Sequence, residues 1–298
     1  MSRTEGEINY PSRIDLARTP TPMEPLKRLS EKLGVEIYVK RDDLTGMELS
    51  GNKVRKLEFV LSEALAQGAD TVITCGGEQS NHARATAVTA AKLGLRSRLI
   101  LSTPDPSNPP PLEGNILLDR LVGAEIVWVS PDEFLRWDEL LEREVEALKR
   151  VNRKPYPIPV GASNPLGAWG YIRAVEELTH DLEALAGDDD IPTTIIHALG
   201  SGGTSAGLLL GVRLHGLKTR VVGVSVGGNR DYFIKVIGRI CEKAISAYQL
   251  NLTFSPERDI EILDGYVGRG YARSRPEELA LIRDVARMEG IMLDPVYT

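Results

Sequence analysis

The stretch from Val35 to Gln67, VEIYVKRDDLTGMELSGNKVRKLEFVLSEALAQ, sets the fold class. Residues 35–40 alternate and are rich in β-branched side chains, which predicts a strand. Residues 53–67 carry apolar side chains at helical spacing, and Gly68 ends that pattern. A strand, a polar loop with glycine and a helix therefore follow one another, with Lys53 at the start of the helix.

The same alternation continues along the chain. Further strands are predicted at 71–75, 98–101, 125–129, 194–199 and 220–226, and further helices at 81–93, 131–151, 166–182 and 204–215. Strands separated by helices predict βαβ units, a mainly parallel sheet and an α/β fold. Two proline-rich segments, 104–111 and 155–159, are interpreted as loops, and the second is a candidate junction between two lobes.

Composition narrows the class of protein. The 298 residues suit one large α/β domain or two lobes that share a site, and a net charge of −6 without a basic block argues against nucleic-acid binding. Two distant cysteines and four scattered histidines form neither a disulfide framework nor a metal-ligand pattern. Neither a secretory signal nor a membrane span is predicted, so a cytoplasmic enzyme is expected.

Lys53 is the first candidate for chemistry. At a helix start the macrodipole disfavours an ammonium, and only a neutral amine can form an imine with an aldehyde. The alternative is a solvated surface lysine.

A second candidate is the loop from Gly200 to Gly207, GSGGTSAG, between a predicted strand and a predicted helix. Glycines at a helix start let backbone N–H groups approach an anion, and Ser201, Thr204 and Ser205 add hydroxyl donors. The loop lacks the lysine of a P-loop and fails GxGxxG because residue 205 is serine, so it favours a phosphate over a nucleotide. The alternative is a turn chosen only for tight packing.

The third candidate, GGEQSNH at 76–82, also lies between a strand and a helix. Ser80 or Asn81 can cap that helix, and capping alone would explain them. Alternatively Ser80, Asn81 and His82 project into the crevice where open α/β sheets bind ligands. His197, inside an apolar strand, is predicted to be a hydrogen-bonded core histidine.

Taken together, KRDDLTG…SGNKVRKLEF, GGEQSNHAR, GSGGTSAG and LDPVYT resemble the D-cysteine desulfhydrase / 1-aminocyclopropane-1-carboxylate (ACC) deaminase family of pyridoxal-phosphate (PLP) enzymes. The resemblance covers roughly residues 16–298. It implies a tryptophan-synthase-β-like fold (fold type II) with two lobes, each a mainly parallel sheet flanked by helices. The large PLP-binding lobe would comprise 1–53 and 163–298, and the small lobe 54–162. A small amino-acid substrate and a homodimer are implied as well.

The resemblance also implies residue roles. Lys53 would be the Schiff-base lysine and α-proton base, Lys56 would reach the cofactor phosphate, and Asn81 would bond the 3′-oxygen of the ring. Thr298 would face the pyridine nitrogen. The phosphate would be held by Ser201, Gly202, Gly203 and Thr204. The substrate would be lined by Ser80, Asn81 and His82 and flanked by Tyr271 and Tyr297. Ser80 would lie near the substrate carboxylate or act in proton transfer, and the catalytic residues would be Lys53, Ser80, Tyr271 and Tyr297.

Thr298 favours one reaction. ACC deaminases of this family typically carry glutamate after the PVY tyrosine, and a carboxylate there keeps the ring protonated and strongly electron-withdrawing. A threonine favours the easier α,β-elimination, D-cysteine to pyruvate, sulfide and ammonia. The alternatives are ACC deaminase, cysteate sulfo-lyase and a PLP-binding fragment without catalysis, since family members continue beyond the position of Thr298.

Overall fold

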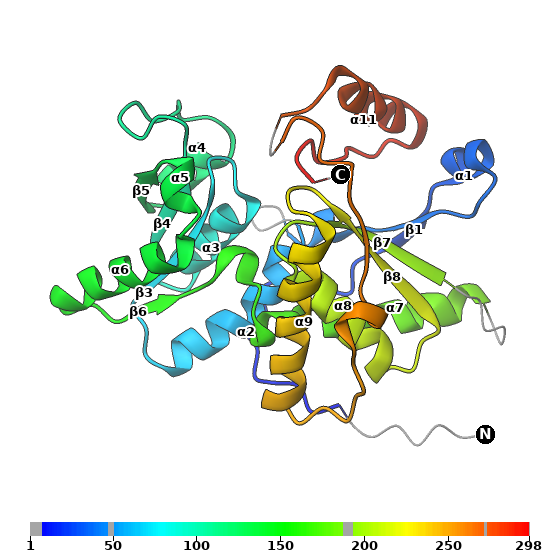
Figure 1. The fold of residues 1–298 in the computed structure, drawn as a ribbon, viewed down its shortest axis with the longest axis horizontal. Coiled ribbons are helices and arrows are strands. Elements are labelled where there is room, and N and C mark those ends of the chain that lie inside the picture. Colours follow the sequence, from blue (N-terminus) through cyan, green and yellow to red (C-terminus); the bar gives the residue numbers. More distant parts are fainter. Residues whose placement is uncertain (1–7, 47–50, 187–192, 271–272, 298) are drawn as a thin grey trace.

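Two parallel sheets, each flanked by helices, form the framework of the protein, as the computed structural model shows for residues 8–46, 51–186, 193–270 and 273–297 (Figure 1). The four-stranded sheet has the order β5-β4-β3-β6 and the three-stranded sheet the order β7-β8-β9, with parallel neighbours throughout. The predicted α/β, fold type II class is confirmed. The lobe boundaries at 53/54 and 162/163 stay a prediction.

The strands of the four-stranded sheet are β3 (Thr71–Gly77), β4 (Arg96–Ser102), β5 (Glu125–Val129) and β6 (Pro155–Pro157). Those of the three-stranded sheet are β7 (Thr193–Leu199), β8 (Thr219–Ser225) and β9 (Glu261–Leu263), and an antiparallel pair is formed by β1 (Met23–Pro25) and β2 (Tyr38–Lys40). The helices are α1 (Lys27–Leu33), α2 (Lys53–Ala66), α3 (Asn81–Lys92), α4 (Gly114–Leu121), α5 (Pro131–Phe134), α6 (Trp137–Arg150), α7 (Pro165–Ala186), α8 (Gly203–Leu214), α9 (Arg230–Ala247), α10 (Pro256–Asp259) and α11 (Pro276–Glu289), with 3₁₀ turns η1 (Asp42–Leu44) and η2 (Val160–Ala162).

Two expectations for local structure are wrong, and the strand predicted at 35–40 is confirmed only at 38–40. The segment 131–151 is not one helix: the capping box of Ser130 and Glu133 starts the short helix α5, and α6 begins only at Trp137 after the non-helical Arg136. The proline-rich 155–157 is not a loop but the edge strand β6, paired in parallel with β3. An edge strand tolerates proline because one side of it has no ladder to complete.

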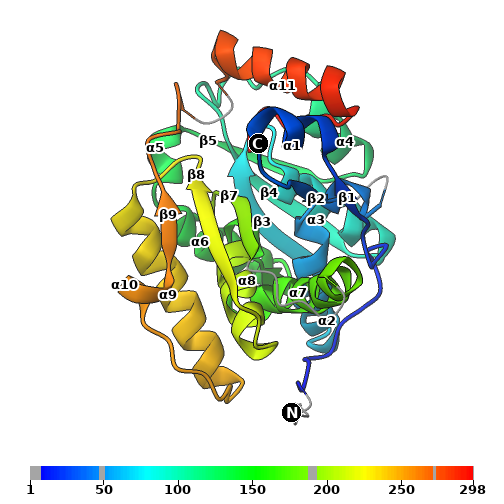
Figure 2. The ribbon, with the colours of Figure 1, turned by 90° about the vertical axis from the view of Figure 1, so that its right-hand side faces the viewer.

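The largest core cluster lies where α2, α7, α8 and α9 pack together (Figure 2), and it includes the fully buried Trp169. Tyr10 and Tyr248 meet the Trp169 ring edge-on, with ring centroids 5.4 and 5.1 Å away. Aromatic pairs at such distances add to the energy of burial. This core holds α2, and hence Lys53, against the helices of the three-stranded sheet.

A buried ion network also holds the start of α2 in place. Arg55, 2% exposed, donates to Asp42 at 2.8 and 2.9 Å and to Glu177 of α7 at 2.8 and 3.0 Å. Tyr171 of α7 donates its hydroxyl to the same Asp42 at 2.5 Å. Buried charges are tolerated when they are paired and hydrogen-bonded in this way. The network thus links η1 to α2 and α7.

No helix among the described residues is long and apolar enough to cross a membrane.

Candidate active site

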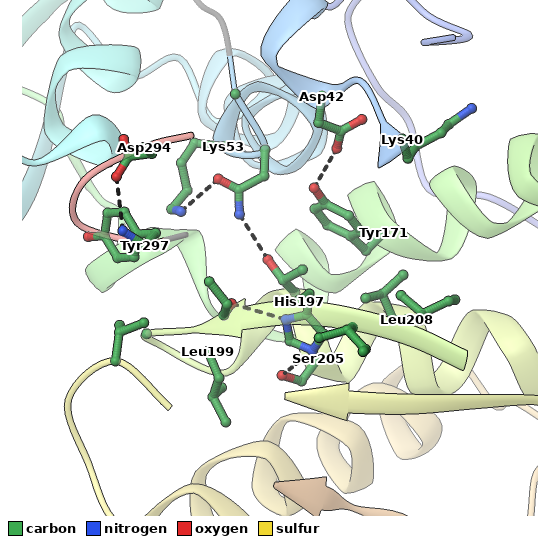
Figure 3. A pocket seen from close by; sticks show the side chains of 18 of the residues that line it. Lys40, Asp42, Lys53, Tyr171, His197, Leu199, Ser205, Leu208, Asp294 and Tyr297 are labelled. Atoms are coloured by element: carbon green, nitrogen blue, oxygen red, sulfur yellow. Dashed lines mark hydrogen bonds between the residues drawn. The ribbon is translucent and has the colours of Figure 1, made fainter. Parts of the chain in front are cut away.

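A cavity of about 2240 Å³ opens at the carboxyl ends of β3 and β7. The loops that follow these strands, the start of α2 and the segment 291–297 all contribute to its lining. Figure 3 shows Lys53, Asp294 and Tyr297 on one side of it and β7 on the other. The carboxyl ends of parallel strands are where open α/β sheets bind ligands.

Lys53, the first residue of α2, points its amine into this cavity (Figure 3). The amine donates to Asn52 Oδ1 at 2.8 Å and lies 5.5 Å from the centre of the Tyr297 ring. The pKa of Lys53 is lowered to about 8, mainly because the protein encloses the amine; the negative charge of Asp294 opposes this shift and the positive charge of Arg84 adds to it. About a tenth of the amine is therefore in the neutral, nucleophilic form at pH 7.

Lys56, one turn along α2, is a buried amine that has no ion-pair partner among the described residues. It is 1% exposed and donates only to the carbonyl oxygen of Gly161, at 3.1 Å. Burial lowers its pKa well below the usual value, and the nearby charge of Lys53 adds to that effect. A buried amine of this kind is normally compensated by an anion.

The start of α8 lies beside that amine. Ser163 Oγ accepts the N–H of Gly203 at 3.1 Å and shares a hydrogen bond of 2.8 Å with Ser201 Oγ. Thr204 Oγ1 accepts from Asn52 at 3.1 Å, which joins this loop to the start of α2. A helix amino terminus, serine hydroxyls and a buried lysine together form an anion cradle.

The two central glycines of this loop do different work. A Cβ on Gly203 would lie 2.6 Å from Ser163 Oγ and 3.0 Å from Lys56 Nζ, so Gly203 keeps the cradle open. Gly202 has a φ of +85°, and a Cβ there would meet Val236 and Ile237 of α9 instead. Gly202 is thus required for the turn and Gly203 for the close approach.

The loop after β3 brings Ser80, Asn81 and His82 to the cavity, where all three contribute to the lining. Ser80 Oγ caps α3 by accepting the Ala83 N–H at 3.1 Å, which leaves the hydroxyl proton for another partner. His82 is 3% exposed and shares a 2.8 Å hydrogen bond between Nε2 and Thr74 Oγ1. Burial lowers the pKa of His82 well below its usual value, so the ring is neutral. His197 is hydrogen-bonded at both nitrogens, but it is half-buried and lines the cavity as well.

Asp294 organises the last described segment. Its Oδ1 accepts the N–H groups of Val296 and Tyr297 at 2.8 and 2.9 Å, and its Oδ2 accepts from Asn81 Nδ2 at 3.0 Å. The Tyr297 ring is held next to the Gly200 loop, where a Cβ on Gly200 would lie 3.2 Å from it. Tyr271 and Thr298, both predicted site residues, lie outside the described residues.

The predicted site residues that line one cavity are Lys53, Ser80, Asn81, His82, Ser201, Gly202, Thr204 and Tyr297. Lys56 and Gly203 lie beside that lining, next to Gly161 and Ser163. Sequence reasoning missed three residues of this site: Asn52, Ser163 and Asp294. Asn52 adjoins the predicted Lys53, and Asp294 belongs to the quoted LDPVYT, so proximity to a motif could have pointed to both. Ser163 carries no such signal.

The family profile described as pyridoxal-phosphate dependent enzyme matches residues 14–298. This chain belongs to that family. PLP is accordingly its cofactor, and the site suits the group. The cradle at Lys56, Ser163 and Gly203 offers a buried amine, which an anion would keep charged, and helix-start donors to a phosphate. The Lys53 amine in the adjoining cavity can meet an aldehyde.

Relatives within the PLP family carry two activities in their names. A bifunctional D-cysteine desulfhydrase/1-aminocyclopropane-1-carboxylate deaminase of Arabidopsis thaliana is 43% identical, over 96% of this chain and 70% of that protein. A D-cysteine desulfhydrase of Klebsiella pneumoniae is 39% identical, over 96% of this chain and 85% of its own. The crystal structure of an ACC deaminase homologue superposes with a TM-score of 0.85 at 38% identity, covering 97% of this chain and 84% of that chain.

The lowered pKa of Lys53 predicts a pH dependence that can be measured without PLP. A small acylating reagent attacks only the neutral amine, so the acylation rate at Lys53 in the cofactor-free enzyme should rise with a midpoint near pH 8. In Asp294→Asn the midpoint should fall, because the carboxylate charge that favours the ammonium is gone. Peptide mass spectrometry across a pH series gives both curves. An Asp294→Asn midpoint above the wild-type value would contradict this electrostatic account.

Proposed function

We propose that this PLP enzyme is a lyase that eliminates the β-thiol of D-cysteine, so that D-cysteine and water give pyruvate, sulfide and ammonia. The observation that carries the proposal is the Lys53 amine, with a pKa of about 8, in a cavity whose lining residues Gly161 and Ser201 adjoin the cradle at Lys56. A base with a pKa near the working pH suits the removal of a proton from the substrate α-carbon.

The side chains divide the work by position. Lys53 would hold the cofactor and take the α-proton, while Lys56, Ser201 and the N–H groups at the start of α8 would bind the phosphate. Bound PLP supplies an aldehyde for the substrate amine and a ring that withdraws electron density from the α-carbon. Ser80 retains a hydroxyl proton that can be donated to the substrate carboxylate. The Tyr297 ring, held through Asp294, would flank the substrate.

The choice of elimination rests on Thr298. In elimination the α-carbon loses a proton and the β-carbon loses thiolate, which is a good leaving group. ACC has no α-proton, and opening its ring breaks a C–C bond, so that reaction depends more strongly on a protonated pyridine nitrogen. A threonine hydroxyl cannot provide the negative charge that keeps the nitrogen protonated.

ACC deamination is the second candidate. It is favoured by the 43% identical Arabidopsis relative, which is named for both activities. The lobe boundaries given above, a homodimeric state and a cytoplasmic location belong to the same proposal and are supported by the family resemblance.

A substrate panel separates the two reactions. The purified enzyme should form pyruvate and sulfide in equal amounts from D-cysteine, and little or no 2-oxobutyrate from ACC. In the same assay, L-cysteine tests which substrate chirality the enzyme accepts, and L-cysteate tests which leaving group it accepts. Thr298→Glu should change the visible absorption of the bound cofactor, since it adds a carboxylate near the ring. Efficient ACC turnover with D-cysteine inert would show that ACC deamination is the correct assignment.

A further inference from the structure

A chain of side-chain amides joins three distant segments beside the cavity. Asn115, the second residue of α4, donates through Nδ2 to the carbonyl oxygen of Gln79 at 2.8 Å and to Asn81 Oδ1 at 3.0 Å. Asn81 in turn donates through Nδ2 to Asp294 Oδ2 at 3.0 Å. Asp294 holds the backbone N–H of Tyr297 at 2.9 Å. The chain thus runs from the β3–α3 loop through α4 to the Tyr297 segment.

The direction of every hydrogen bond in this chain is determined by its two ends. The backbone carbonyl of Gln79 and the carboxylate of Asp294 can only accept, so each must face an amide nitrogen. Asn115 therefore points Nδ2 towards Gln79, and Asn81 points Nδ2 towards Asp294. The one arrangement left for the middle bond is donation from Asn115 to the Asn81 carbonyl oxygen.

Asn115 is itself held in place by further contacts with the same loop. Its backbone N–H donates to Gln79 Oε1 at 2.8 Å, and Gln79 Nε2 donates back to the carbonyl oxygen of Glu113 at 3.3 Å. Both amide hydrogens of Asn115 are then in use, one to Gln79 and one to Asn81. The Asn115 amide is therefore fixed in orientation, and its N–H keeps the Asn81 carbonyl oxygen facing it.

We infer that Asn115 is a positioning residue for the cofactor site. By donating to Asn81 Oδ1 it keeps the Asn81 carbonyl on the α4 side, so that Asn81 presents N–H donors towards Asp294 and the cavity. The inference rests on the proposed role of Asn81 at the 3′-oxygen of PLP, an acceptor that requires a donor. An Asn81 amide turned over would offer that oxygen a second acceptor instead.

Asn115→Asp tests this directly, because it replaces the donor by an acceptor of almost the same shape. The new carboxylate would face Asn81 Oδ1, so the Asn81 amide should turn over and place its carbonyl against Asp294. We expect PLP to bind about tenfold more weakly, the loss of one well-placed hydrogen bond. The visible absorption of the bound cofactor and the pH midpoint of that absorption should shift as well. Asn251→Asp, the same exchange at an exposed loop residue, is the matched control and should change neither quantity.

A double-mutant cycle with Asn81→Ala separates the possible outcomes. Asn81→Ala should itself shift the spectrum, and Asn115→Asp should add no further shift in the Asn81→Ala background. A wild-type spectrum for Asn81→Ala would refute the proposed role of Asn81 and the inference with it. Two outcomes would overturn the positioning role alone. In the first, Asn81→Ala shifts the spectrum but Asn115→Asp does not. In the second, the effect of Asn115→Asp is as large in the double variant as in the single variant. Thermal unfolding is measured for the cofactor-free forms of these variants and of Asn115→Ala, and it identifies any general loss of folding.

Discussion

Lys53→Ala is expected to lower kcat for the physiological substrate by about 10⁴-fold, the upper range for removal of a general base. The variant loses the amine that would take the α-proton and the covalent link to PLP at the same time. PLP should still bind through the cradle at Lys56 and Gly203, so the absorption of noncovalent cofactor should replace that of the wild type. Steady-state kinetics and a visible spectrum measure the two effects.

Lys149→Ala is the matched control, because Lys149 is an exposed lysine of α6 paired only with Glu146. It should retain wild-type kcat and spectrum. If Lys53→Ala kept more than a tenth of wild-type kcat, another group would have to be the base.

Gly203→Val should weaken PLP binding by about 100-fold. The Cβ would lie 2.6 Å from Ser163 Oγ and 3.0 Å from Lys56 Nζ, so the branched side chain would occupy the cradle. Two lost charge-assisted hydrogen bonds to the phosphate account for a change of that size. Equilibrium titration of the cofactor-free enzyme with PLP measures the dissociation constant.

Ala247→Val is the control for this experiment. Ala247 is an exposed residue at the end of α9, away from the cavity lining, so the larger side chain should leave the dissociation constant unchanged. Circular dichroism establishes whether Gly203→Val is folded. A folded Gly203→Val that binds PLP as tightly as the wild type would mean that the 200–204 loop serves packing alone.

Local patterns in the sequence predict much of the secondary structure, and the failures have local causes. The strand at 125–129 has the predicted bounds, and the helices at 53–66 and 81–92 end within one residue of prediction. The segment 131–151 reads as one amphipathic helix, yet the capping box at Ser130 makes a separate short turn first. No helix was predicted at 230–247, although Phe233, Ile237, Cys241 and Ala244 are spaced as one buried face.

The site is less predictable than the fold because its contacts are long-range. Motif reasoning assigns Lys53 and the 200–204 loop, since a strand, a loop and a helix start are all visible locally. Ser163 is 38 residues from Ser201 and 40 residues from Gly203 in the sequence, and it contacts both in the cradle. Asp294 contacts Asn81 across 213 residues. No spacing rule relates such residues, so only the folded chain identifies them.

Borohydride reduction of the purified enzyme, followed by peptide mass spectrometry, tests the central claim most directly. Reduction should bleach the cofactor colour and leave the mass of PLP on one peptide, the one containing Lys53, with fragmentation that separates Lys53 from Lys56. PLP mass on Lys56 or on any other lysine, or a cofactor that reduction never fixes to the chain, would contradict the assignment of Lys53.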